Sequence, residues 1–197
     1  VTGVQTCALP ISQLIDWYQQ IINYYPGSNI GEKGDINNPN EKSFWWKQHL
    51  LAVAGQWDIL RERSQFVLDS EIKKHKRYLI DHRFYIALAN QDKTQMEEIL
   101  AEMTSPAVAK FRNFSFELGA TENLMATYST LFAKIAWVHG IEVETNSRWI
   151  PKEWLPMTPL DHYEEPWPFL SEFDIYTPFK DHLADRSPVK RVDFPAK

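Results

Sequence analysis

The stretch QDKTQMEEILAEMTSP, residues 91–106, decides the fold class of this chain. Its apolar side chains recur at the spacing of one helical face; they are Met96, Ile99, Leu100 and Met103. Asp92 stands at the expected N-cap, and Gln95 stands at the matching capping-box position. Pro106 is predicted to end the helix, because proline lacks the N–H that a helix interior needs. The segment therefore predicts an amphipathic α-helix.

Further helices are predicted on both sides of this segment. The pattern favours helices over residues 13–25, 44–55, 58–70, 78–90, 107–119 and 121–140. Ser43 is the expected N-cap of the 44–55 helix. The basic cluster Lys73, Lys74, Lys76 and Arg77 is expected to be an exposed helical face. In the 121–140 helix, the expected buried face carries Leu124, Tyr128, Leu131, Ile135 and Val138, and Gly140 is the expected C-terminal cap.

The sequence changes character after Gly140. Residues 141–145 are expected to be extended, and residues 150–156 to form one helical turn between prolines. Proline then recurs among aromatic residues, which excludes a long helix or an inner strand. We predict an all-α fold, an irregular helical-hairpin (α-solenoid-like) domain over residues 13–155. Residues 156–197 are expected to be an extended acidic, Pro/aromatic-rich C-terminal segment, packed at least partly on that domain.

Residues 1–12, VTGVQTCALPIS, show neither helical nor strand periodicity. Their reverse translation resembles a short-read sequencing adapter, so we interpret this segment as non-native and exclude it from fold reasoning. The single cysteine of the chain, Cys7, lies there. The rest then has no cysteine for a disulfide, a nucleophile or a metal site, which fits a reducing, cytoplasmic location. If the natural start is missing, a signal peptide could have been lost with it.

The composition argues against several classes of partner. The net charge of −5 disfavours a nucleic-acid binder, because such proteins usually carry a basic face. No apolar run of about 18 residues is present, so we predict no transmembrane helix and no membrane partner. Hydrophobic residues make up 44% of the chain and aromatic residues 14%, which indicates a globular protein with a core.

The sequence contains no recognisable catalytic or cofactor motif. We find no zinc-protease, nucleophile-elbow, phosphate-loop or dinucleotide pattern, and we predict no catalytic residue, cofactor or metal. Three histidines follow an aspartate directly, but neighbouring residues on a helix point about 100° apart and do not form a dyad. An enzyme whose site is assembled from dispersed residues, such as His49, His82, His139 and Glu144, remains an alternative.

Acidic and aromatic residues concentrate in residues 161–185, which hold seven carboxylates against a single lysine. Aromatic anchors surrounded by charge are typical of protein-binding surfaces. The predicted partner-binding residues are Asp161, Tyr163, Glu164, Glu165, Trp167, Glu172 and Asp174. The alternative is a solvated acidic tail whose aromatic side chains point inward.

The segment AKIAWVHGIEVETNSRWIPKEWL, residues 133–155, resembles the C-terminal end of the immunity protein 49 family of bacterial polymorphic toxin systems. In that family a final helix ends in glycine, and an extended Val-Glu stretch and a Ser-aromatic-Ile-Pro run follow. The corresponding residues here are Ala136, Gly140, Ile141, Val143, Glu144, Ser147, Trp149, Ile150 and Pro151. A tryptophan-bearing helix with Trp45 and Trp46 is also similar, and the loose similarity covers residues 44–155. The part after Pro156 has no counterpart.

The resemblance implies an all-α immunity protein that binds a cognate protein toxin in the same cell and blocks it sterically. The acidic segment would then face a basic toxin such as a nuclease. No catalytic motif is carried over from the family, and the oligomeric state is not predicted. A generic α-solenoid adaptor, with several partners of moderate affinity, is the main alternative.

Overall fold

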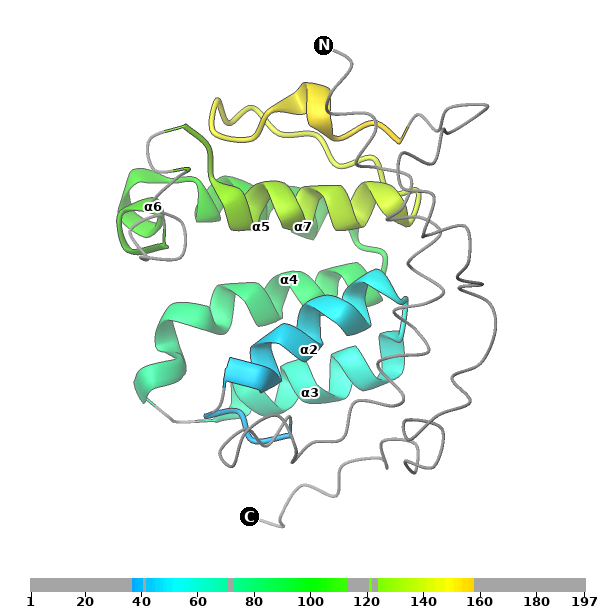
Figure 1. Ribbon diagram of the computed structural model, residues 1–197, viewed down its shortest axis with the longest axis vertical. Coiled ribbons are helices and arrows are strands. Elements are labelled where there is room, and N and C mark those ends of the chain that lie inside the picture. Colours follow the sequence, from blue (N-terminus) through cyan, green and yellow to red (C-terminus); the bar gives the residue numbers. More distant parts are fainter. Residues whose placement is uncertain (1–36, 41, 71–72, 113–120, 122–123, 158–197) are drawn as a thin grey trace, which may run out of the picture. The chain divides into compact units, whose positions relative to one another are not determined.

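The computed structural model describes residues 37–40, 42–70, 73–112, 121 and 124–157. Within these ranges the chain is all-α and contains no strand, as the sequence predicts (Figure 1). The α-helices are α2 (Lys42–Val53), α3 (Trp57–Asp69), α4 (Leu79–Ala89), α5 (Lys93–Met103), α6 (Pro106–Arg112) and α7 (Thr127–Val138). Two 3₁₀ helices, η1 (Lys73–Tyr78) and η3 (Lys152–Trp154), complete the regular elements of these ranges.

Several predictions fall outside the described residues. They are the helix over 13–25, the 113–119 part of the helix over 107–119, and the extended segment beyond residue 157. The boundary after residue 12 and most of residues 156–197 also lie outside them, so the predicted division into domains stays a prediction. The described residues fall into two compact units, residues 37–54 and residues 55–157, which we describe separately.

Helix α2 makes up most of the described part of the first unit. Ser43 lies inside this helix and not before it, because the helix begins two residues earlier than predicted, so the predicted N-cap is wrong. The buried side chains follow a helical repeat; they are Phe44, Lys47, Gln48, Leu51 and Ala52. Trp46 stands off this stripe and is 70% exposed.

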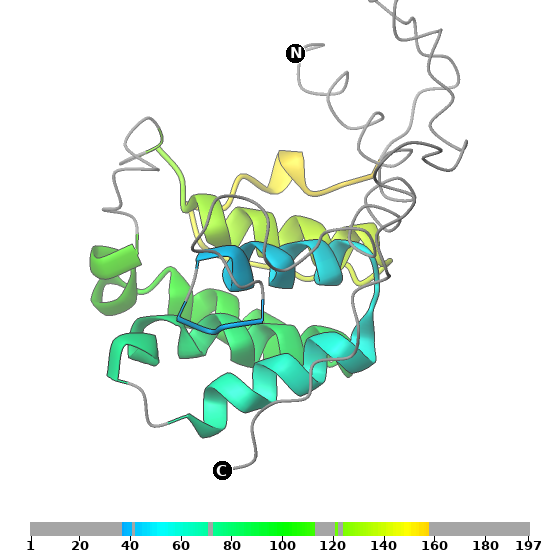
Figure 2. The same cartoon turned by 60° about the horizontal axis from the view of Figure 1, so that its bottom comes forward.

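Helix α4 is the central element of the second unit. It packs against both α3 and α5 in two helical hairpins, and α5 in turn contacts α6 and α7 (Figures 1 and 2). Apolar residues cover it nearly all round; the buried ones are Ile80, Phe84, Tyr85, Ala87, Leu88 and Ala89. The prediction that the second half of residues 71–90 is buried is confirmed. The basic residues before it form η1, where Lys73, Lys76 and Arg77 are exposed as predicted.

The turn between α4 and α5 confirms the predicted N-cap. The Asp92 carboxylate accepts a hydrogen bond of 3.0 Å from the Gln95 backbone N–H. The Asp92 N–H reaches back to the Ala87 carbonyl at 2.9 Å, which closes α4 with the 6→1 bond of a Schellman motif. Gln91 takes the left-handed position of this motif with φ of 56°, where glycine is usual. Helix α5 ends before Pro106, which becomes the first residue of α6, where its missing N–H costs nothing.

Helix α7 differs from its prediction at its start and on its buried face. It begins at Thr127 and not at residue 121. Of the predicted face, Ile135 is buried, whereas Leu131 is 38% exposed. The side chains that are buried instead include Ser129, Phe132, Ala133 and Ala136.

Packing on α4 explains this rotation of the helix. Phe132 stacks on Phe84 with ring centroids 5.0 Å apart and meets the Tyr85 ring edge-on at 5.3 Å. The smaller buried residues of α7, Ser129, Ala133 and Ala136, share this face with Phe132. The ring contacts of Phe132 with α4 therefore identify the buried face, and the number of large apolar residues on each face does not.

Candidate protein-binding surface

Residues 141–157, which we call the strap, follow α7 and return along it. The prediction of one helical turn within residues 150–156 is confirmed by η3, and no regular element covers residues 141–147. The Trp137 indole Nε1–H donates to the Val143 carbonyl at 3.1 Å. The Ala126 N–H, at the other end of α7, donates to the Trp149 carbonyl at 2.8 Å. These two bonds fix residues 143–149 of the strap antiparallel to α7, and the chain then turns back along the helix.

Lys134 holds the returning end of the strap. Its ammonium group donates to the carbonyls of Trp154, Leu155 and Pro156 at 2.8, 3.0 and 3.0 Å. An ammonium group has three N–H donors, so all of them are used. The three carbonyls lie at the C-terminal end of η3 and just after it, and the positive charge of Lys134 compensates their partial negative charges. Burial lowers the pKa of Lys134 from its ordinary value of 10.5.

Helix α5 holds the strap at a second place. The Glu97 carboxylate accepts the Glu144 backbone N–H at 2.8 Å. The Lys93 ammonium lies 3.5 Å from the Glu97 carboxylate and 3.6 Å from that of Glu144. Apolar side chains complete the attachment; Val143, Ile150 and Leu155 are buried. The strap is therefore held by hydrogen bonds to its backbone atoms, mostly from side chains of α5 and α7, and by three buried apolar side chains.

The residues that carry the family resemblance build this arrangement. Gly140 ends α7 with φ of 75°, and the Ile141 N–H bonds to the Ala136 carbonyl at 2.9 Å, so the predicted glycine cap is confirmed. The Ser147 hydroxyl accepts the Trp149 N–H at 3.3 Å in the turn before η3. The sequence signal over this segment therefore corresponds to the backbone geometry of the strap.

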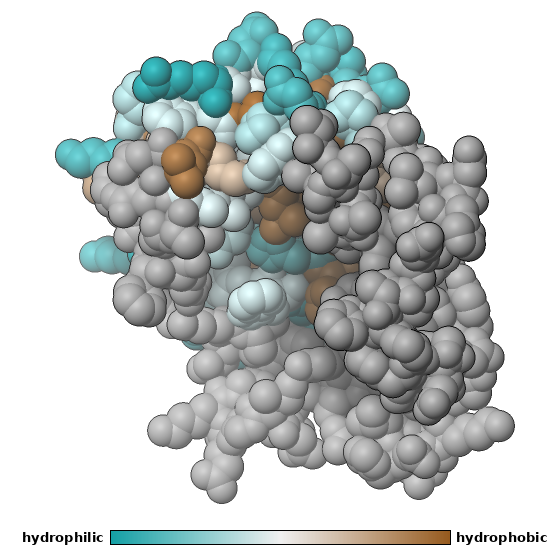
Figure 3. Space-filling model, turned by 45° about the horizontal axis from the view of Figure 1, so that its top comes forward, coloured by the Kyte–Doolittle hydropathy of each residue, from teal (hydrophilic) through white to brown (hydrophobic). Residues whose placement is uncertain are grey.

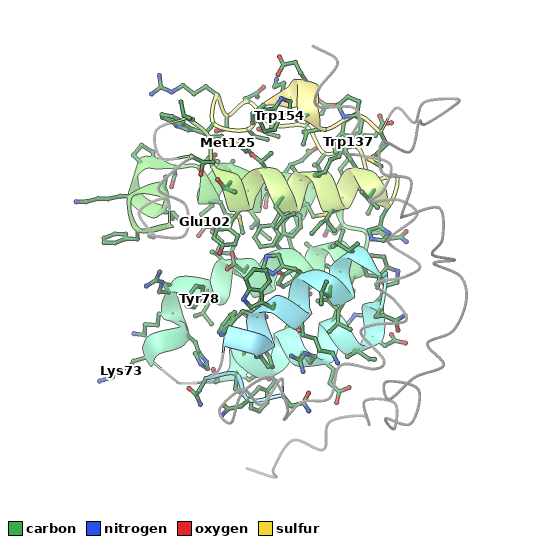
Figure 4. All side chains as sticks on the ribbon, in the orientation of Figure 1. Lys73, Tyr78, Glu102, Met125, Trp137 and Trp154 are labelled. Atoms are coloured by element: carbon green, nitrogen blue, oxygen red, sulfur yellow. The ribbon has the colours of Figure 1, made fainter. Side chains whose placement is uncertain are left out.

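The outer side of the strap exposes aromatic and charged groups. The Arg148 guanidinium lies 4.4 Å from the centre of the Trp149 ring, in cation–π geometry. Trp154 is 45% exposed, and Lys152 and Glu153 beside it are exposed. Figure 4 shows Trp154 on η3, and Figure 3 shows this side as mainly hydrophilic with separate hydrophobic patches. We call these five residues the strap surface.

The chemistry of the strap surface fits recognition of another protein. Tryptophan and arginine are the residue types that most often dominate binding energy at protein interfaces. Charged neighbours supply the polar rim that such interfaces have. Sequence analysis did not select these side chains as binding residues, although an Arg-Trp pair near a second tryptophan is a visible signal. Nothing local marks Lys134, which acts on carbonyls 20 to 22 positions away.

The partner-binding residues predicted from the sequence lie outside the described residues. They are Asp161, Tyr163, Glu164, Glu165, Trp167, Glu172 and Asp174. Their role stays a prediction, and the structure assigns them no geometry.

The dispersed residues of the alternative enzyme site have separate neighbours. His49 belongs to the first unit, where its ring Nδ1 lies 3.0 Å from the Trp45 carbonyl. In the second unit, His82 is fully buried with its ring 5.8 Å from that of Tyr85. His139 meets the ring of Trp57 at 4.6 Å, and Glu144 is largely exposed. In the part of the chain that the structure describes, no three histidine, cysteine or carboxylate groups are placed to hold a metal ion.

Comparison of the chain with protein-family models, with curated proteins and with solved structures gives no match. Among the described helices, none is both long enough and apolar enough to span a bilayer. The functional assignment therefore rests on the chemistry and geometry of the strap surface.

Proposed function

We propose that this chain is an immunity protein that binds a cognate bacterial protein toxin and neutralises it by steric blocking. The strap surface carries the proposal. The segment whose sequence resembles the immunity protein 49 family is also the segment that exposes Trp154 and Arg148, with the Arg148 guanidinium over the half-buried Trp149 ring. Steric blocking needs an occupied toxin surface and no chemistry of its own, so it needs no catalytic group in this chain.

The attachment of the strap favours tight binding. Ordering a mobile segment at an interface costs about 0.5–1.5 kcal/mol for each immobilised side chain. Bonds from Lys134, Trp137 and Glu97 fix the strap backbone before any partner arrives. The aromatic groups of the strap surface are then presented with less conformational entropy left to lose.

The acidic segment has a complementary role in this proposal. Its carboxylates, of which Glu164, Glu165, Glu172 and Asp174 are four, would attract a basic toxin over longer distances. Such attraction raises the association rate more than it slows dissociation. The strap surface would then determine how long the complex lasts.

Alanine substitutions on the strap surface test the proposal against the toxin encoded beside the source gene. We expect Trp154→Ala to weaken binding of that toxin at least about tenfold, mainly through faster dissociation, and to reduce rescue of toxin-expressing cells. Trp46→Ala is the matched control, because it removes an equally large exposed indole from the other compact unit. Surface plasmon resonance measures both rate constants, and colony counts measure rescue.

Charge reversal at Glu164, Glu165, Glu172 and Asp174 is the companion variant. We expect slower association and a weaker salt dependence, with the dissociation rate nearly unchanged. If Trp154→Ala and the charge reversal both leave toxin inhibition intact, these surfaces do not make the complex. Several partners of moderate affinity and no tight binding to the neighbouring toxin would favour the adaptor alternative.

A further inference from the structure

The end of the second unit that carries η1 and α6 is cationic. Lys73, Lys76 and Arg77 are exposed on η1, and Lys110 is exposed on α6. We call these four residues the cationic end. Neither helix contains an aspartate or a glutamate. Figures 1 and 2 both place η1 and α6 on the same side of this unit, and Figure 4 shows Lys73 pointing away from the helices.

The three-residue repeat of a 3₁₀ helix sorts the side chains of η1. Residues i and i+3 share a face of such a helix, so Lys73 and Lys76 lie on one face and His75 and Tyr78 on another. His75 is buried, with its ring Nδ1 3.2 Å from the Ser70 hydroxyl, and Tyr78 is half-buried. The inward face thus fixes η1 and holds its cations toward solvent.

Two carboxylates near the neighbouring helix ends have partners outside η1 and α6. Glu102, near the end of α5, pairs with the Arg83 guanidinium at 2.9 Å. Asp69, the last residue of α3, accepts a hydrogen bond of 2.8 Å from the Gln65 side chain. The Arg83 guanidinium compensates the charge of Glu102, whereas the neutral Gln65 amide orients the Asp69 carboxylate without compensating it.

Aromatic rings accompany the cations at this end. The Arg77 guanidinium lies 4.9 Å from the centre of the Tyr78 ring, and the Lys110 ammonium lies 5.9 Å from that of Phe111. Phe111 is 70% exposed. An exposed phenyl ring beside the Lys110 cation offers an apolar contact together with charge complementarity.

We propose that the cationic end binds an acidic segment of a partner protein, with carboxylates on Lys73, Lys76 and Lys110 and an apolar side chain on Phe111. This surface is distinct from the strap surface, and the proposal does not depend on the toxin. A short acidic segment responds to local charge within about one Debye length, roughly 10 Å. Nucleic acids and anionic bilayers respond to charge over a larger area, where the net charge of −5 opposes them.

Fluorescence anisotropy with the full chain tests this proposal. The probe is a fluorescein-labelled peptide of about ten residues, half of them glutamate, with one central phenylalanine. We expect Lys73→Glu combined with Lys76→Glu to weaken peptide binding at least tenfold at low salt, and Phe111→Ala to weaken it about threefold. The matched control combines Arg148→Glu with Lys152→Glu, which changes the net charge equally on the strap surface. Circular dichroism checks that each variant keeps its helices.

Each possible outcome decides the proposal. Loss of peptide binding in the Lys73→Glu and Lys76→Glu double variant, with binding kept by the control double variant, supports the proposal. Equal losses with the control pair would mean that only net charge is sensed, and absence of binding by the wild type would also refute it. Tighter binding of a single-stranded RNA or of phosphatidylserine vesicles, measured under the same conditions, would assign the surface to that class instead. Self-association without peptide, abolished by the Lys73/Lys76 pair, would assign it to a second copy of the chain.

Discussion

The helical core of the second unit and its strap are held by different forces. On α4 and α7, fully buried side chains such as Phe84, Tyr85 and Phe132 pack against one another. The strap buries few apolar groups, and side chains from α5 and α7 hold its backbone atoms through hydrogen bonds. Burial of apolar area dominates the first region, while directional polar bonds dominate the second.

The core therefore determines how stable the second unit is, whereas the strap determines how its own surface side chains are held toward solvent. Large apolar side chains in the core contribute a large share of the free energy of unfolding. Hydrogen bonds to the partly exposed strap contribute less to global stability, because water can replace them when the strap opens. The two regions are therefore expected to respond to mutation on different scales and in different measurements.

The largest expected effect is in the core. Phe132→Ala removes the ring between Phe84 and Tyr85, and we expect the free energy of unfolding to fall by about 3–5 kcal/mol. Urea denaturation followed by circular dichroism measures the loss. Leu131→Ala, on the neighbouring and partly exposed position of α7, should cost about 1 kcal/mol. Equal losses from the two variants would contradict the assignment of the buried face.

A smaller effect is expected at the strap. Lys134→Met keeps the aliphatic stem but removes three hydrogen bonds to carbonyls, and we expect a local loss of about 1–2 kcal/mol. Faster hydrogen exchange in residues 150–157, with unchanged exchange in α4, reports it. Lys152→Met is the control, because Lys152 is exposed on the strap surface. Uniform acceleration throughout the unit would mean that strap and core unfold together.

The pH dependence of the free energy of unfolding, compared between wild type and Lys134→Met, gives a second measurement of the Lys134 interaction. The pKa of Lys134 is lower in the folded chain than its ordinary 10.5, because burial disfavours its charged form. Between these two pKa values Lys134 binds more protons in the unfolded chain, so its contribution to the free energy of unfolding rises with pH there. The stability difference between wild type and Lys134→Met should therefore grow as pH approaches 10.5 from below. A difference that shrinks in this window would contradict the direction of the shift.

The smallest effects are expected at two helix ends that share one geometry. Gly140 and Gln91 both take the left-handed position of a Schellman motif. A Cβ at Gly140 would meet no atom within 4 Å, so Gly140→Ala measures the backbone cost alone, about 1 kcal/mol. Gln91→Gly should raise the free energy of unfolding by about 0.5–1 kcal/mol. It relieves the same backbone strain, and the conformational entropy that glycine adds to the unfolded chain offsets part of this gain. Thermal unfolding of both variants checks these opposite signs.

The sequence predicts those structural features that depend on residues close together in the chain. The N-cap bond of Asp92 joins residues three positions apart, and the apolar stripe of α5 lies within three turns, so both are visible in a short window. The face of α7 depends on a fit to α4, about fifty positions earlier, which periodicity does not report. The bond from Glu97 to the Glu144 N–H spans 47 positions. The hydrogen bonds that attach the strap therefore became recognisable only in the folded chain, whereas the strap-surface residues 148, 149 and 152–154 are close neighbours in the sequence.

The way in which the strap is attached has a consequence for divergence among related sequences. Lys134, Trp137 and Ala126 bind carbonyl oxygens, and every amino acid supplies one. Substitution of an outward side chain such as Trp154 or Arg148 leaves those acceptors in place. If the strap binds a partner as we propose, new specificities can therefore arise by exchange of its surface side chains, while the backbone that presents them stays the same.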